Sequence, residues 1–208
     1  MPSKAGEGRV TGIGKVPVVS AEFRAPGPKL GGLGSGVKGD FIGSQDHHGG
    51  DDQAVYAYSR EELDQWAARL SRDLPNGMFG ENLTTLDVDV DGARIGERWA
   101  VGREVVLEVR SARIPCATFQ ARMGEKGWVK RFTAVGNSGA YLSVIAPGTV
   151  RQSDPIEVVS QPEHDIDVRL AFRAFSGDLQ AAERVVAAAC LAESDHNFLA
   201  DRLRRRTS

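Results

Sequence analysis

Short apolar runs separated by glycine-rich segments dominate residues 9–160 of the chain. Val105, Leu107 and Val109 occupy every second position of a run at 104–114, the period of a strand with one buried face. Residues 54–58 form a β-branched and aromatic run typical of a strand. Further strands are expected at 9–14, 16–25, 82–86, 98–102, 140–145 and 155–159. The first two of these are expected to pair with each other, and Pro147 and Gly148 are expected to end the strand at 140–145.

Helical spacing is clearest at 59–74, where Ser59 and Glu62 form the S-x-x-E capping signature. Apolar residues then recur on one face until Pro75 and Gly77 stop the helix. Alanine-rich helical segments follow at 167–175, 178–192 and 195–206. The pattern therefore predicts a mainly β fold with α-helices, in which a β-rich domain at 1–160 precedes a small helical extension at 161–208.

Composition and charge bear on which classes of partner the protein binds. The 208 residues are 41% hydrophobic and 26% charged, which is ordinary for a globular chain, and the formal net charge of −2 gives no global attraction to nucleic acid or to an anionic membrane. No apolar run approaches the roughly 20 residues of a membrane helix, and the first ten residues lack the apolar segment of a signal peptide. We therefore expect a cytoplasmic protein that uses neither nucleic acid nor a membrane as partner.

Two cysteines, Cys116 and Cys190, lie far apart in different contexts, so a structural disulfide is not expected in the cytosol. Cys190 lies in the apolar helical stretch "AAACLA" and is expected to belong to the core. Cys116 follows "RIP" at the end of a predicted strand, with Arg113 three residues before it. A nearby guanidinium would favour the reactive thiolate, whereas free cysteine is also among the most commonly buried residues; both interpretations stay open.

The segment "GDFIGSQDHHGGDDQAVYAY" collects acidic and histidine side chains before the strand at 54–58. A solvated polar loop is one interpretation. A zinc site is the other interpretation, but no C-x-x-C spacing supports it, and adjacent histidines rarely share a tetrahedral centre. The side chains concerned are Asp40, Asp46, His47, His48, Asp51 and Asp52.

The string "MFGENL" at 78–83 is compatible with a hairpin turn. No phosphate-binding loop of the G-x-x-x-x-G-K-[ST] type is present, and "GIG" is too short for a dinucleotide fingerprint.

Five blocks, taken in order, carry a more specific signal. They are "TGIGKVPV", "GDFIGSQDHHGGDDQAVYAY", "FGENLTT", "RIPCATF" and "GAYLSVIAPGTV". In this order they resemble the MOSC domain, the family related to the C-terminal part of molybdenum cofactor sulfurases, and most closely its stand-alone bacterial YiiM-like members. The resemblance covers about residues 9–160, and the helical tail is similar to the three-helix extension of that type.

The resemblance implies a closed, β-barrel-like fold and a site for the molybdenum–pyranopterin cofactor. It implies that Cys116 is the functional cysteine, which ligates molybdenum or carries a persulfide sulfur. Soft thiolate suits this metal, and glycine-rich turns with basic side chains suit the pterin phosphate. The remaining candidates for cofactor contact are Lys15, Asp40, His48, Gly49, Gly50, Asn82, Arg113 and Tyr141. The carboxylates of Asp40 and Glu81 would contact the pterin or only fix the loops.

Related members reduce N-hydroxylated bases and amidoximes with electrons from a separate reductase, so the resemblance implies such a substrate and partner. An alternative is a carrier of cofactor or of persulfide sulfur. That sulfur would come from a separate desulfurase, because this chain has no room for the pyridoxal-phosphate-dependent half of full sulfurases. Gln53 and Asn137 stand where many members have basic residues. These departures support a third alternative, a barrel of this shape that binds some other small anion.

Overall fold

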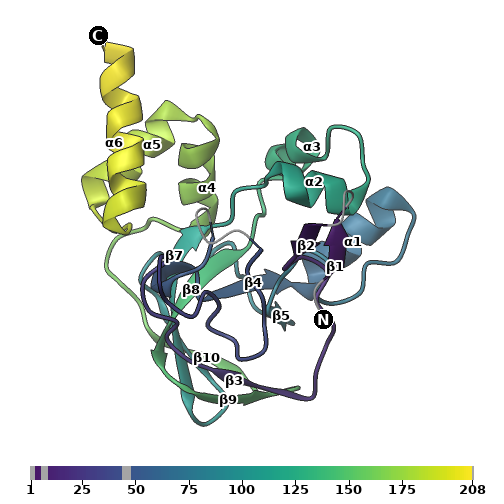
Figure 1. Cartoon of the computed structure of the whole chain (residues 1–208). Coiled ribbons are helices and arrows are strands. Elements are labelled where there is room, and N and C mark those ends of the chain that lie inside the picture. Colours follow the sequence, from purple (N-terminus) through teal and green to yellow (C-terminus); the bar gives the residue numbers. More distant parts are fainter. Residues whose placement is uncertain (1–2, 6–8, 44–47, 208) are drawn as a thin grey trace.

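The computed structural model describes residues 3–5, 9–43 and 48–207. Its main sheet has six strands in the order β10-β6-β7-β8-β4-β5. All neighbours are antiparallel except β4 and β5, which are parallel. The strands are β4 (Val55–Ser59), β5 (Leu83–Thr85), β6 (Arg98–Val101), β7 (Val105–Ala112), β8 (Ala140–Ala146) and β10 (Ile156–Ser160). The mainly β prediction is confirmed, and Figure 1 shows this sheet below and between two groups of helices.

The sheet curls but does not close, so the expectation of a closed barrel is wrong in this respect. Both β10 and β5 are edge strands of the six-stranded sheet. β8 ends at Ala146, and Pro147 lacks the N–H that would continue its ladder. The chain then starts β9 (Gly148–Arg151), which pairs with β3 (Ser20–Phe23) in a separate two-stranded sheet. Pro147 therefore ends one strand, as expected, but another begins directly after it.

The N-terminal strands pair differently from the expectation. β2 (Arg9–Thr11) pairs with β1 (Ser3–Ala5), whereas the segment predicted as its partner supplies β3 for β9. The predicted pair is therefore wrong. Strand pairing depends on which edges meet in space, and the strand pattern of each segment does not contain that information.

Three helices form a group beside the sheet (Figure 1). α1 (Arg60–Leu70) begins as predicted, since the Ser59 side chain accepts a hydrogen bond from the Glu62 N–H at 3.2 Å. It ends earlier than the predicted stop at Pro75, because Ser71 adopts the left-handed conformation and caps the helix. The other two, α2 (Ala117–Met123) and α3 (Trp128–Val135), were not predicted from the sequence. Their aromatic side chains pack together: the ring centroids of Phe119 and Phe132 are 5.2 Å apart.

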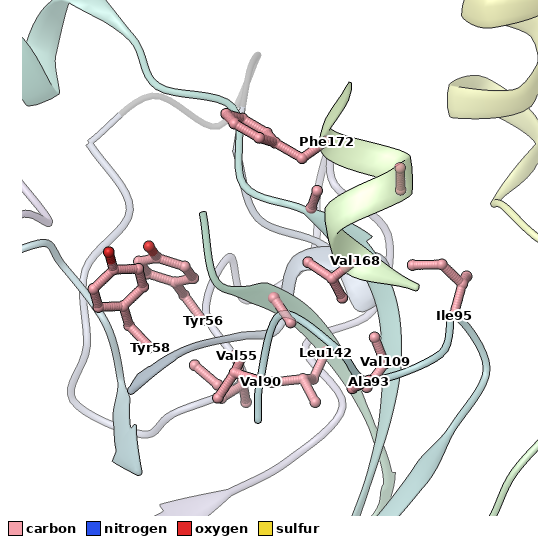
Figure 2. Packing of buried hydrophobic residues seen from close by; sticks show 14 of the residues in the cluster. Val55, Tyr56, Tyr58, Val90, Ala93, Ile95, Val109, Leu142, Val168 and Phe172 are labelled. Carbon is pink, nitrogen blue, oxygen red and sulfur yellow. The ribbon is translucent and has the colours of Figure 1, made fainter. Parts of the chain in front are cut away.

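The second group contains α4 (Val168–Ser176), α5 (Leu179–Ala188) and α6 (Glu193–Thr207), which follow the predicted helical segments. Val168 and Phe172 of α4 are buried in the same core as Val109 and Leu142 of the sheet. Figure 2 shows Val168 on the side of α4 that faces these strands. In the described part of the chain, no helix combines the length and the apolar character needed to cross a membrane.

Candidate functional site

Cys116 lies at the junction between the long strand β7 and helix α2. β7 ends at Ala112, and Cys116 occupies the N-cap position of α2 in an extended conformation. Pro115, immediately before it, removes one backbone donor from this junction. The side chain is half-buried and forms no disulfide. The local sequence thus leaves the thiol where a strand has ended and a helix has just begun.

The surroundings of Cys116 favour its thiolate. Burial raises the pKa of the thiol, but three groups outweigh this effect: the His48 side chain, the backbone N–H of Phe119 and the charge of Arg113. Together they lower the pKa from 9.0 to about 7. By contrast, burial raises the pKa of the Cys190 thiol. Of the two thiols, only Cys116 is therefore substantially ionised near neutral pH.

Strand register brings Arg113 and Tyr141 to this thiol. Tyr141 on β8 lies opposite Ser111 on β7 and opposite Tyr56 on β4. Arg113 follows two residues after Ser111 and is only 4% exposed. Its guanidinium lies 3.7 Å from the centroid of the Phe119 ring and 5.4 Å from that of Tyr56. The Arg113 Nη1 atom has no hydrogen-bond partner in the described part of the protein, so a buried cation with an unused donor lies beside Cys116.

The turn at 48–50 places His48 beside Cys116. The Gly50 N–H donates to the carbonyl of Gly34 at 3.1 Å, and the Gly49 N–H donates to Gln53 Oε1 at 3.3 Å. Both glycine amides that we expected to approach a cofactor are thus already bonded within the protein. Gly50 has φ of 83°, and a Cβ there would lie 2.9 Å from the Cα of Lys29. The turn therefore positions His48, and Gln53 fixes the turn.

A second polar group surrounds Asp40. Its Oδ2 atom accepts hydrogen bonds from Lys15 Nζ at 2.7 Å, Ser35 Oγ at 2.7 Å and Asn82 Nδ2 at 2.8 Å. Asn82 also accepts a hydrogen bond from the Tyr56 N–H at 3.1 Å, which continues the pairing of β4 and β5. The Lys15 charge is thus compensated by Asp40.

Glu81 fixes a loop in this region. Its carboxylate accepts hydrogen bonds from the backbone N–H groups of Gly77 and Phe79 and from Thr84 Oγ1. Burial raises its pKa, and these hydrogen bonds oppose the rise. Of the two roles weighed for Glu81, its contacts match loop fixation.

The predicted site residues therefore fall into two neighbouring groups. Cys116, His48, Arg113 and Tyr141 form the first, and Lys15, Asp40 and Asn82 line a cavity of about 940 Å³ that does not include the first group. Tyr56 connects them: its backbone bonds Asn82, and its ring centroid is 5.4 Å from that of Tyr141. Sequence reasoning missed Tyr56, although it lies in the quoted "AVYAY" run.

The two departures from the family pattern have structural roles. Gln53 holds the 48–50 turn, as described above. Asn137 donates to Glu62 Oε1 at 2.7 Å and accepts from Arg169 Nε at 3.0 Å, so it ties α1 to α4. Two members of the acidic and histidine cluster, Asp46 and His47, lie outside the described residues. Within the described ranges, no three His, Cys, Asp or Glu side chains are placed to share a metal ion.

Comparisons with known proteins find relatives in sequence and in fold. The chain is 34% identical over 160 residues to YflK from Bacillus subtilis (strain 168), which covers 76% of this chain and 72% of YflK. It is 31% identical over 131 residues to a Gibberella moniliformis protein named Reductase, covering 62% of this chain and 23% of that protein. The crystal structure of YiiM from Escherichia coli is similar with a TM-score of 0.73 and 25% identity, covering 92% of this chain and 89% of that one.

The model of the MOSC domain matches residues 44–157, which contain the 48–50 turn, β7, Cys116 and β8. The match spans more than half of the chain, YflK is 34% identical over 160 residues, and the Escherichia coli YiiM structure has a similar fold. This chain therefore belongs to the MOSC domain family.

Proposed function

We propose that the chain binds the molybdenum–pyranopterin cofactor through Cys116 and reduces N-hydroxylated compounds such as hydroxylaminopurines and amidoximes. The observation that carries the proposal is the half-buried Cys116 thiol at the β7–α2 junction, beside a buried guanidinium with an unused donor. MOSC domains are associated with this cofactor at the level of the family, and one relative is named a reductase.

The residues at the junction fit the chemistry of the cofactor. Molybdenum takes soft sulfur ligands, and a thiol whose pKa is about 7 supplies a thiolate near neutral pH. Arg113 matches a phosphate or another anionic group, because its Nη1 donor is buried without a partner. Burial raises the pKa of the Tyr141 hydroxyl, and Arg113 and Cys116 lie close enough to affect it. These residues would hold the molybdenum and the phosphate end of the cofactor on the Cys116 side of Tyr56.

When bound, the cofactor supplies the redox and oxygen-atom chemistry. Reduction of an N–OH group to N–H consumes two electrons and two protons and releases one water molecule. The electrons would come from a separate reductase. This chain would supply the sulfur ligand, hold the thiolate with His48 and the Phe119 N–H, and exclude water from the buried guanidinium.

Metal analysis of the protein made in a cofactor-competent host tests the proposal. Wild-type protein should contain molybdenum and reduce benzamidoxime with reduced viologen as electron donor, whereas Cys116→Ser should lose both. Cys190→Ser is the matched control and should retain both, because Cys190 lies on the helical side of the molecule, next to α5. Full molybdenum content and activity in Cys116→Ser would contradict the proposal.

The ionisable Cys116 thiol also suits the second candidate, a persulfide carrier. The thiolate would take the terminal sulfur from a donor cysteine persulfide, and the donor would leave as its own thiolate. Incubation with a cysteine desulfurase and cysteine should then add the mass of one sulfur atom to wild type but not to Cys116→Ser. An unchanged mass of the wild-type protein would count against this candidate.

A further inference from the structure

The cavity beside Asp40 lies where the curled sheet fails to close. Both edges of the six-stranded sheet contribute to its lining, through Leu83–Thr85 of β5 and Ile156 of β10. Its volume of about 940 Å³ is within the usual range for small-molecule sites. Cys116 and Arg113 do not line it. The open seam of the sheet is thus a second candidate binding site.

Asp40 presents a fixed hydrogen-bond acceptor to this cavity. Three donors hold its Oδ2 atom, whereas Oδ1 has no hydrogen-bond partner in the described parts of the chain. The Asp40 side chain is 10% exposed and lines the cavity. Because Oδ2 is held, Oδ1 cannot turn away to find another partner. A ligand N–H would satisfy it.

The charge and the rim of the cavity restrict the ligand further. Its acidic lining residues, Glu22, Asp40, Glu81, Asp87 and Asp154, outnumber its basic ones, Lys15, Lys38 and Arg151. This excess of carboxylates disfavours a phosphate or a carboxylate ligand. Val16 and Leu86, each 66% exposed, line the cavity together with half-exposed Phe41, so an apolar body is favoured next to the polar end.

We propose that this cavity binds a flat, neutral or cationic molecule that presents an amino- or amidine-type N–H edge to Asp40 Oδ1. Two sources have this edge: the pterin of the cofactor and a substrate or product of the N-hydroxylated class. The choice between these two sources depends on the proposed function. The binding of an N–H edge by Asp40 does not depend on it.

Benzamidine and benzoate test the proposal on the purified full chain, because they share a ring and differ in the edge that they present. Calorimetry should show benzamidine binding and at least tenfold weaker binding of benzoate. Asp40→Asn should weaken benzamidine about ten- to hundredfold, as expected for a lost charged hydrogen bond. Glu157→Gln is the matched control: Glu157 on β10 is exposed and does not line the cavity, so affinity should change less than twofold. Equal affinity for the two probes, or unchanged affinity in Asp40→Asn, would overturn the proposal. The comparison of the two probes needs no variant, so it stands if Asp40→Asn does not fold.

Cofactor-loaded and cofactor-free protein distinguish the two sources. If 2-aminopurine binds both samples, the edge belongs to the substrate; if it binds only cofactor-free protein, the edge belongs to the pterin. Binding to neither sample would overturn the proposal. In Cys116→Ser, benzamidine affinity should stay within twofold of wild type even if molybdenum is lost, because Cys116 is not part of the cavity. Failure of the proposed function is therefore separable from failure of this inference.

Discussion

Individual residues with the same predicted role differ in their surroundings. Lys15 and Arg113 were both expected to contact the pterin phosphate. Lys15 is paired with Asp40, and burial lowers its pKa although that carboxylate opposes the shift. Arg113 keeps a buried donor without a partner among the described residues. We therefore expect Arg113, and not Lys15, to provide the main contact with an anion.

The first prediction concerns the reactivity of Cys116. In a Cys190→Ser background, the rate of alkylation by iodoacetamide should rise with pH through a midpoint of about 7, because the thiolate is the nucleophile. Below the midpoint the rate should fall about tenfold per pH unit. His48→Ala should move the midpoint upward, since the hydrogen bond from His48 and its charge favour the thiolate. Peptide mass spectrometry at a series of pH values measures the rate. An ordinary midpoint of about 8.5 in the background protein would refute the assignment.

The second prediction concerns Asp91, a buried carboxylate that accepts hydrogen bonds from the N–H groups of Ser138 and Gly139 at 2.7 and 2.8 Å. Burial raises its pKa from 3.8 to about 6, although these hydrogen bonds oppose the rise. A carboxyl whose pKa is raised on folding stabilises the fold fully below pH 3.8, and this contribution is lost as the pH rises through 6. Between pH 4 and pH 7, the unfolding free energy of wild type should therefore fall by about 2 kcal/mol relative to Asp91→Asn.

Urea denaturation of both proteins at several pH values measures this difference. Asp89→Asn is the control with the opposite sign, because its hydrogen bond with Arg169 lowers the pKa of Asp89. A constant difference between wild type and Asp91→Asn across this range would contradict the prediction.

At the scale of elements, α2 and α3 show why sequence reasoning missed two helices. The α3 sequence "WVKRFTAV" is rich in aromatic and β-branched residues, which favour strands. Its buried residues Trp128 and Phe132 are nevertheless four positions apart, as are Phe119 and Met123 of α2. Each helix is too short for this spacing to dominate the pattern. Packing of these aromatic rings on Phe79 decides the helical conformation.

The third prediction compares two glycines of equal backbone conformation. Gly77 and Gly136 have φ of 84° and 86°, but a Cβ at Gly77 would lie 2.3 Å from the carbonyl oxygen of Lys15, whereas Gly136 has open space. Gly136→Ala should lower the free energy of unfolding only by the strain of the left-handed conformation, about 1–2 kcal/mol. Gly77→Ala should cost about 2–5 kcal/mol, since it must also displace the Lys15 segment. Thermal and urea unfolding measure the loss of stability in each variant. Equal losses in the two variants would contradict the role of the close contact at Gly77.

At the scale of the whole molecule, the helical extension shares its core with the sheet. Val168, Ala171 and Phe172 of α4 are buried, and Phe172 contacts Phe132 of α3 with ring centroids 6.5 Å apart. Ser111 of β7 also donates to Asp195 Oδ2 of α6 at 2.8 Å. The predicted boundary at 160/161 remains a prediction, and these contacts suggest how to test it.

The fourth prediction is that a chain ending at Ser160 does not unfold cooperatively. Removing 161–208 would expose the apolar surface under α4, including Val109 and Leu142. Calorimetry should show one sharp transition for the full chain and none for the shortened chain, which should bind a dye specific for exposed apolar surface. A sharp transition in the shortened chain would establish residues 1–160 as an independent domain.

The sequence by itself determined the position of β7 and the start of α1, where the signals are local, and the family, through five ordered motifs. These features are local or additive along the chain, so a linear pattern contains them. The tertiary structure decided which strands pair, that the sheet stays open after Pro147, and that the candidate residues divide into a Cys116 group and an Asp40 cavity. Each of these outcomes depends on which distant groups meet in space and satisfy one another's hydrogen bonds and charges. No single segment of the sequence contains that information.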